Sequence, residues 1–208
     1  MYTLCYSPGS CSLVIHALLE ELHVPFEVRL VDAKSEEYRR INPKGKVPAL
    51  ITPEGVLTEC VALIEYLCDK HDREHRWLGK PGTWERARTL ERLATLATEV
   101  HPLFNRYFHV DDFSADAGVQ GAVKARGTEK LLGYFRQQDA SLRTPCWSGG
   151  DDVTAADLYF MVVARWGRWL EPPANEMPNI RPFYQRMIAR PAVARAFAAE
   201  GIKAFGTP

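Results

Sequence analysis

Cys11 is the first residue in the chain whose type and position could do chemistry. In YSPGSCSLVIHALLEEL (6–22), an apolar strand pattern ends in a Pro-Gly turn, and a helical pattern begins at the cysteine. A helix start presents unpaired N–H groups and a partial positive charge, which stabilise a thiolate. Ser10 and Ser12 flank the thiol and could donate hydrogen bonds to its sulfur. The alternative is a packing residue, because free cysteine is among the most buried residue types.

A proline follows a valine in KVPAL (46–50), where a short strand is predicted. Pro48 at the start of a strand is harmless, since its missing N–H is not needed there, and this is the simpler interpretation. The functional interpretation is that Pro48 turns the backbone N–H and C=O of Val47 outward. An extended peptide ligand could then pair with Val47 as an added strand.

A glutamate stands where another helix begins, in LTEC (57–60). Thr58 is the predicted N-cap of a helix over 59–71. The helix start suits an anionic ligand group, and Glu59 could accept an ammonium. On these residues alone we favour the alternative, in which Glu59 only offsets the helix dipole.

A histidine, His101, lies near the end of the helical stretch ATEVHP (97–102), with Thr98 and Glu99 on the same turn. It is either a hydrogen-bonded packing residue or a cationic or donor group beside a bound thiolate. In VTAAD (153–157), Thr154 and Asp157 fit a capping box. The helix that follows is apolar nearly all round, so we expect it to form the core of a helical domain.

The elements that position these residues change in kind along the chain. Strand patterns over 1–6, 24–32, 47–51 and 56–58 alternate with helical patterns over 11–22, 35–41 and 59–71. The first βαβ unit implies parallel strands with a right-handed crossover, and the turn at 53–55 implies an antiparallel hairpin. Only helical patterns follow, over 83–108, 115–142, 155–169, 180–190 and 191–200. The sequence therefore predicts an α/β domain (1–75) with a mixed four-stranded sheet, a linker (76–82) and an all-α domain (83–208).

Composition excludes several classes of function. The 208 residues carry 26 Lys+Arg and 26 Asp+Glu, and this balance offers no electrostatic reason to expect a nucleic-acid or membrane partner. Neither an 18-residue apolar run nor a signal-peptide pattern is present, and the five cysteines are odd in number and lack a CxxC motif. We therefore expect a cytoplasmic protein. His71 and His75 have no third ligand nearby in the sequence, and no metal site is predicted.

Taken together, these motifs resemble those of cytosolic glutathione transferases, most closely the bacterial beta class. YSPGSCS, INPKGKVPAL, LTE with its helix, ATEVH and TAADLY occur in that family's order and at close to its spacing over nearly the whole chain. The resemblance implies a thioredoxin-like domain before a helical one, a homodimer, and glutathione as co-substrate in a cleft between the domains.

The resemblance also assigns roles to residues. Cys11 would contact the glutathione sulfur and could form a mixed disulfide with it. Val47, next to a cis Pro48, would bond the cysteinyl backbone, and Glu59 and Cys60 would hold the γ-glutamyl end. Further residues are implied for the glycine carboxylate (Lys34), for the electrophile side and the partner subunit (His101, Thr98, Glu99), and for an apolar electrophile pocket (Phe104, Tyr107, Phe108, Trp166).

Two residues depart from the family's pattern. Cys60 stands where the family often has serine, and a thiol is a poor donor to a carboxylate. Ala94 stands where the class often has asparagine, so a polar contact to glutathione is lost. The main hypothesis is attack of the glutathione thiolate on an electrophilic carbon or on a disulfide, the latter through exchange at Cys11. The rival hypothesis, which these two departures favour, is a non-catalytic binding module on the same fold.

Overall fold

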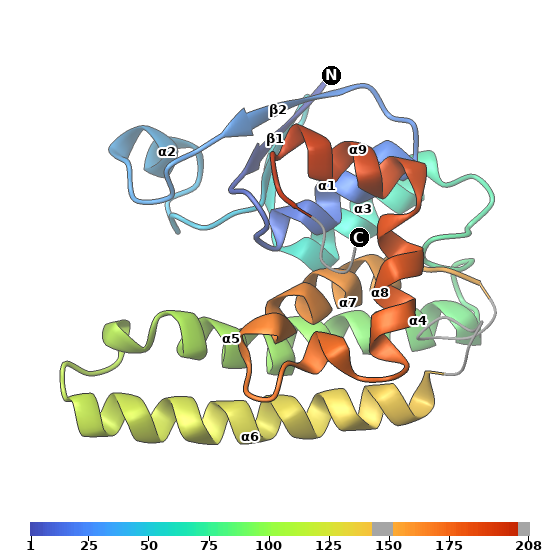
Figure 1. The fold of residues 1–208 in the computed structure, drawn as a ribbon. Coiled ribbons are helices and arrows are strands. Elements are labelled where there is room, and N and C mark those ends of the chain that lie inside the picture. The colour runs from blue at the N-terminus through green and yellow to red at the C-terminus, as the bar shows by residue number, and fades with distance from the viewer. Residues whose placement is uncertain (143–151, 204–208) are drawn as a thin grey trace.

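The first part of the protein is a mixed sheet covered by helices. The computed structural model describes residues 1–142 and 152–203, so Cys146 lies outside the described residues. The strand order is β2-β1-β3-β4 (Figure 1). Its strands are β1 (Tyr2–Tyr6), β2 (Phe26–Leu30), β3 (Ala49–Thr52) and β4 (Gly55–Thr58), and its helices are α1 (Ser12–Glu21), α2 (Glu36–Ile41) and α3 (Cys60–His71).

The pairing of the strands confirms the predicted topology. β1 runs parallel to β2, with Tyr2 opposite Phe26, as the βαβ pattern requires. β3 pairs with β1 in antiparallel fashion, and the hairpin with β4 turns between Thr52 and Gly55. Gly55 has a φ of 137°, which residues with a side chain rarely adopt. The central strands β1 and β3 bring the residues after β1 and before β3 to the same end of the sheet.

The second part of the described chain is helical, as predicted. The expected helix over 83–108 is divided by a π-helical turn, which shifts the face that the following residues present. The expected helix over 155–169 ends three residues early, in a 3₁₀ turn. The elements are α4 (Trp84–Thr95), π-helical η1 (Leu96–Val100), α5 (His101–Phe108), η2 (Val110–Asp112), α6 (Ala117–Ser141), α7 (Ala155–Trp166), η3 (Gly167–Trp169), η4 (Ala174–Glu176), α8 (Ile180–Ile188) and α9 (Pro191–Ala199).

Helix α7 is the centre of the molecule, with α1 on one side and α6 on the other (Figure 1). Every residue of α7 is buried, which confirms the expected core helix. The capping box is present as predicted, with the Asp157 carboxylate accepting from the Thr154 backbone N–H at 2.8 Å. No helix in the described ranges is long and apolar enough to cross a membrane.

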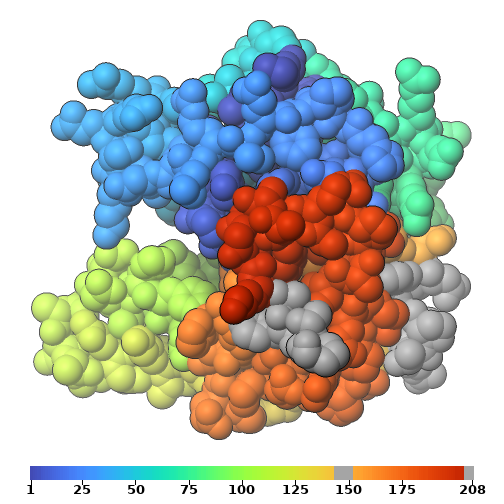
Figure 2. Space-filling model, turned by 45° about the horizontal axis from the view of Figure 1, so that its top comes forward, coloured from blue at the N-terminus to red at the C-terminus, as the bar shows by residue number. Residues whose placement is uncertain are grey.

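The last helix returns to the first part of the chain. Helix α9 lies along α1 in Figure 1, and Figure 2 shows the two segments in contact at the surface. The Arg190 guanidinium donates to both carboxylate oxygens of Glu21, at 2.6 and 3.0 Å. Arg195 donates to Glu20 at 2.6 Å. The two bonds from Arg190 form a bidentate pair. Charge-assisted bonds of this kind fix the orientation of α9 on α1.

The loop before Cys11 is held by the helical part from both sides. The Gly9 N–H donates to Glu200 Oε2 at 2.8 Å, and the Trp166 indole N–H donates to the Gly9 carbonyl at 3.0 Å. The other oxygen of Glu200 meets His16 Nδ1 at 3.0 Å, and both of these side chains are buried. Gly9 has a φ of 67°, and an added Cβ would lie 2.7 Å from Arg165 Nη1. The position therefore requires glycine for its backbone and for its space.

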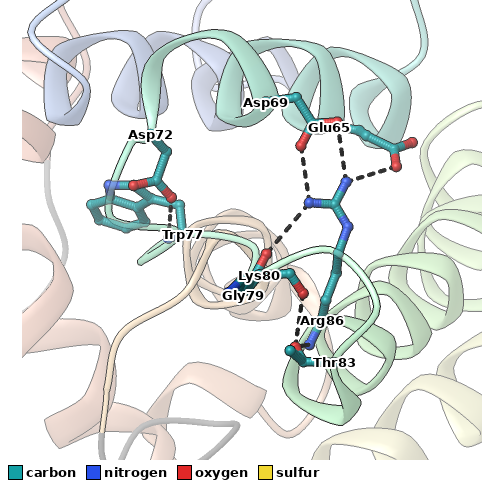
Figure 3. Close-up of polar contacts among 8 residues, drawn as sticks. All are labelled: Glu65, Asp69, Asp72, Trp77, Gly79, Lys80, Thr83 and Arg86. Carbon is teal, nitrogen blue, oxygen red and sulfur yellow. Dashed lines mark hydrogen bonds and ion pairs between the residues drawn. The ribbon is translucent and has the colours of Figure 1, made fainter.

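A buried arginine joins α3 to α4 across the connecting segment (Figure 3). Arg86 on α4 donates to Asp69 at 2.9 Å and to Glu65 at 2.9 Å, both on α3. Within the segment itself, the Trp77 backbone N–H donates to Asp72 at 2.7 Å. These bonds fix the path of the chain between the sheet and the helices.

We expect Arg86→Gln to lower the free energy of unfolding by roughly 1–2 kcal/mol, because the arginine is nearly buried and bonds two carboxylates. Arg88→Gln on the same helix is the control. Arg88 pairs with Glu91 in solvent, and such pairs contribute about 0–1 kcal/mol. Urea denaturation of both variants measures the difference. Equal losses would contradict the role given to Arg86.

We expect Gly9→Ala to cost about 1–3 kcal/mol more in stability than Gly82→Ala. Both glycines have positive φ, at 67° and 81°, so both variants carry the same backbone strain. Only Gly9 also has a neighbouring atom within 4 Å of the added Cβ. Thermal and urea denaturation of the two variants test this, and an equal loss would show that the loop does not press on Arg165.

Candidate functional site

The thiol of Cys11 lies where α1 begins. Cys11 occupies the N-cap position of α1 and is 7% exposed. Its Sγ donates to the Val47 carbonyl at 3.2 Å. The peptide bond from Val47 to Pro48 is cis, as the resemblance implies. The start of α1 and the backbone just before β3 therefore meet at the sulfur.

The two serines beside the thiol are directed elsewhere, which corrects the expectation that they donate to the sulfur. Their hydroxyl oxygens lie 2.7 Å from each other, and Ser12 is fully buried. The Ser12 hydroxyl donates to the Ser7 carbonyl at 3.2 Å, and the Ser10 oxygen accepts the Ser12 N–H at 3.2 Å. The two hydroxyls satisfy hydrogen-bonding groups of the loop backbone, which need partners inside the protein.

Helix α3 begins one residue later than predicted, at Cys60, and the residue before it has an unusual conformation. The N-cap position belongs to Glu59, not Thr58, and Glu59 has a φ of 73° without a side-chain cap bond. Thr58 is instead the last residue of β4, paired with Ala49. A non-glycine residue at positive φ costs free energy and is concentrated at functional sites. The conformation sends the Glu59 carboxylate outward, where Lys44 Nζ donates to it at 2.8 Å.

A second thiol lies beside the first. Cys60, the first residue of α3, is buried, and its Sγ donates to the Cys11 carbonyl at 3.7 Å. Hydrogen bonding with the Cys11 side chain, followed by burial, raises the pKa of Cys60 well above its usual value. The site therefore contains two thiols at two helix starts. Cys11 Sγ contacts the Val47 carbonyl, and Cys60 Sγ contacts the carbonyl of Cys11 itself.

A tyrosine from the helical part completes the cluster. Tyr159 on α7 is buried, and burial, followed by the neighbouring Cys60 and Cys11 groups, raises the pKa of its phenol. Its hydroxyl lies 2.8 Å from His101 Nδ1. In the sequence, Tyr159 is part of the TAADLY motif, and no role was predicted for it. Its phenol could have indicated a role, because a tyrosine hydroxyl that is buried in a largely apolar helix needs a polar partner.

His101 lies between Tyr159 and Trp166. Its ring centroid is 5.0 Å from that of Trp166. Burial, followed by the charge of Lys46, lowers the pKa of His101. The imidazole is therefore neutral near pH 7, which argues against the cationic role considered from the sequence and leaves that of a neutral donor or acceptor. The charge of Glu59 acts in the opposite direction and raises the pKa, but less than burial and Lys46 lower it.

The aromatic residues expected around an electrophile contact one another, and one of them, Trp166, contacts His101. Phe108 is 40% exposed and lies at 5.5 Å from Tyr107 and 6.3 Å from Trp166 between ring centroids. Phe104 is fully buried, and it supports Phe108 and Trp166 from behind at 5.7 and 5.5 Å. Phe108 is thus the member of this group with the most surface for a ligand.

The remaining predicted residues are Lys34, Thr98 and Glu99. Lys34 is exposed between β2 and α2. The Thr98 hydroxyl, on η1, donates to the Ala94 carbonyl near the end of α4 at 2.9 Å. Glu99 lines a separate cavity of about 290 Å³, together with Arg92 and Tyr134. In residues 1–142 and 152–203, no group of three or more His, Cys, Asp or Glu side chains is arranged to hold a metal ion.

The surface is hollowed between the two parts of the molecule. Figure 2 shows a notch between the blue segment around α2 and the yellow-green segment at the end of α5 and the start of α6. These are the segments that adjoin Lys46 and Phe108 in the chain. A ligand in this hollow would touch both parts of the molecule.

Comparisons with known proteins agree with this geometry. The family model for the N-terminal domain of glutathione S-transferase matches residues 4–75, and that for its C-terminal domain matches residues 94–191. Glutathione S-transferase GstA of Escherichia coli O157:H7 is 35% identical over 207 residues, covering 96% of this chain and 99% of its own. The comparisons give no support to a non-catalytic binding module.

Two solved structures have the same fold over nearly the whole chain. A beta class glutathione S-transferase from Sphingomonas chungbukensis has a TM-score of 0.85 at 28% identity, covering 97% of this chain and 100% of its own. A sphingomonad glutathione S-transferase complexed with glutathione has a TM-score of 0.84 at 30% identity, with the same coverage. Sequence, fold and relatives agree, and the chain belongs to the glutathione S-transferase family.

Proposed function

We propose that the protein binds glutathione in the hollow between its two parts and activates the glutathione thiol for attack on an electrophile or a disulfide. One observation carries the proposal: the Cys11 thiol lies at the start of α1 and contacts the backbone beside the cis peptide bond at Pro48. A helix start stabilises a thiolate, and an exposed strand backbone can pair with a peptide ligand. The related sphingomonad protein was solved with glutathione, which supports the same ligand here.

Each part of glutathione has a complementary group in this arrangement. The cysteinyl backbone would pair with Val47, and its sulfur would meet Cys11. The γ-glutamyl carboxylate would accept N–H groups at the start of α3, where Cys60 lies, and its ammonium would meet the exposed Glu59. Lys34 remains the proposed partner of the glycine carboxylate. Ser10 and Ser12 would act indirectly, by closing the loop that holds Cys11 in place.

The proposed chemistry begins with the glutathione thiolate, which attacks the second substrate. Each unit by which a thiol pKa falls corresponds to about 1.4 kcal/mol of thiolate stabilisation. With an electrophilic carbon, a thioether forms and the leaving group departs. With a disulfide, exchange yields a mixed disulfide, which Cys11 can also enter. Phe108, with Tyr107 and Trp166 around it, favours an apolar second substrate.

The family also suggests the setting of the protein. We propose a cytoplasmic homodimer, with Thr98 and Glu99 toward the partner subunit. We retain the division into domains 1–75 and 83–208 with a linker at 76–82 as part of this proposal. In this division, the bonds from Arg86 to its α3 partners would connect the two domains.

Isothermal titration of glutathione into the protein tests the proposal. We expect binding to the wild type and about tenfold weaker binding to Cys11→Ala, since that loss corresponds to about 1.4 kcal/mol, in the range of one hydrogen bond to a charged group. Cys68→Ala removes another buried thiol, on the far turns of α3, and is the matched control that should bind as the wild type does.

Two outcomes would contradict the proposal. Unchanged affinity in Cys11→Ala would make Cys11 a packing residue. The absence of binding to any of the three proteins would mean that Cys60 and Ala94 have removed the glutathione site, and a binding module for another ligand would then be favoured.

The neutral state of His101 predicts a pH dependence of stability. Because its pKa is lowered on folding, the unfolded chain binds the proton more tightly, and stability falls as the pH drops below about 6.5. In His101→Gln this contribution is absent. The difference in unfolding free energy between wild type and variant should therefore shrink between pH 7 and pH 5. A difference that grows in acid would mean that His101 is charged in the folded protein.

A further inference from the structure

We infer that Cys11 and Cys60 form a redox-active pair, in which Cys60 resolves a mixed disulfide on Cys11 by closing an intramolecular disulfide. The observation that points to it is the contact between Cys60 Sγ and the Cys11 carbonyl, at 3.7 Å. Both thiols are free and buried, and each stands at a helix start. The inference goes beyond the proposed function, because any small disulfide that reaches Cys11 suffices.

The positions of the two residues suit a disulfide. A carbonyl oxygen lies near its own Cα, so the 3.7 Å contact places Cys60 Sγ within roughly 6 Å of the Cys11 Cα. The side chains also contact each other, since hydrogen bonding with Cys11 is the largest cause that raises the pKa of Cys60. The two sulfurs therefore lie in the same neighbourhood, as a disulfide between them requires.

The reaction proceeds by two thiol-disulfide exchanges. In the first, the Cys11 thiolate attacks a small disulfide, one S–S bond forms to Cys11, and one half of the substrate leaves as a thiol. In the second, Cys60 attacks Cys11 Sγ, the mixed disulfide breaks, and the other half leaves as a thiol. The substrate disulfide is reduced and the two cysteines are oxidised. Two equivalents of an external thiol reverse the process and form one disulfide.

The surroundings of Cys60 favour its attack once Cys11 is modified. Hydrogen bonding with the Cys11 side chain and the charge of that group both raise the pKa of Cys60. Both effects end when Cys11 enters a neutral mixed disulfide. Burial and the charge of Glu59, which raise the pKa, and the interaction with Tyr159, which lowers it, remain. Tyr159 also contacts His101 at 2.8 Å, which gives the proton of Cys60 a path out of the core. Cys60 is therefore easier to deprotonate after the first exchange than before it.

The test is to treat the protein with bis(2-hydroxyethyl) disulfide and to measure its intact mass under denaturing, thiol-blocking conditions. We expect the wild type to lose two free thiols without gaining mass from the reagent. Cys60→Ser should instead retain one mercaptoethanol adduct on Cys11. Cys68→Ser, a matched change on the same helix, should behave as the wild type does. Chymotrypsin cleaves after Tyr6 and Tyr66, so the linked peptides distinguish Cys11 and Cys60 from Cys5 and Cys68.

The peptide map of the wild type shows whether Cys11 and Cys60 form a disulfide, even if a variant fails to fold. A peptide that links Cys11 to Cys60 supports the pair. A stable adduct on Cys11 in the wild type, equal to that in Cys60→Ser, would overturn it. A disulfide from Cys11 to any other cysteine, or no reaction of Cys11 at all, would overturn it as well.

Discussion

The buried carboxylate of Glu200 holds together the features on which the site depends. It accepts the Gly9 N–H with one oxygen and meets His16 with the other, at 2.8 and 3.0 Å. Trp166 holds the Gly9 carbonyl from the opposite side. A carboxylate removed from water must have such partners, and here they belong to the loop before Cys11 and to the helix after it. The position of the thiol is therefore set by the end of the chain, although Cys11 lies near its beginning.

This arrangement explains why the site needs both parts of the molecule. The sheet and its helix starts provide Cys11 and Cys60, which alone would be two thiols on a surface. Helix α7 crosses beneath them and brings Tyr159, which connects them to His101 on α5. The same helix provides Trp166, which donates a hydrogen bond to the Gly9 carbonyl and contacts the His101 ring. A thiol cluster, a polar connection out of the core and an aromatic wall thus depend on one buried helix.

Local patterns predicted the fold well, because each element carries its own signal. The hairpin turn and the capping box at Thr154 are each determined by a few neighbouring residues, and both are present in the structure. The site was less predictable, because it depends on contacts between distant residues. Thr58 has a side chain suited to an N-cap, but it pairs with Ala49 as the last residue of β4. Glu59 therefore occupies the N-cap position of α3. Nothing local could show that Tyr159 reaches His101, or that Glu200 holds Gly9, 191 positions earlier.

The most direct test of the central claim is a crystal structure of the protein with glutathione bound. We predict that the glutathione sulfur lies in contact with Cys11 Sγ, that its cysteinyl backbone pairs with Val47, and that its γ-glutamyl group lies at the start of α3. A glutathione molecule bound elsewhere, with its sulfur away from Cys11, would contradict this assignment even if the protein proved to be an active transferase.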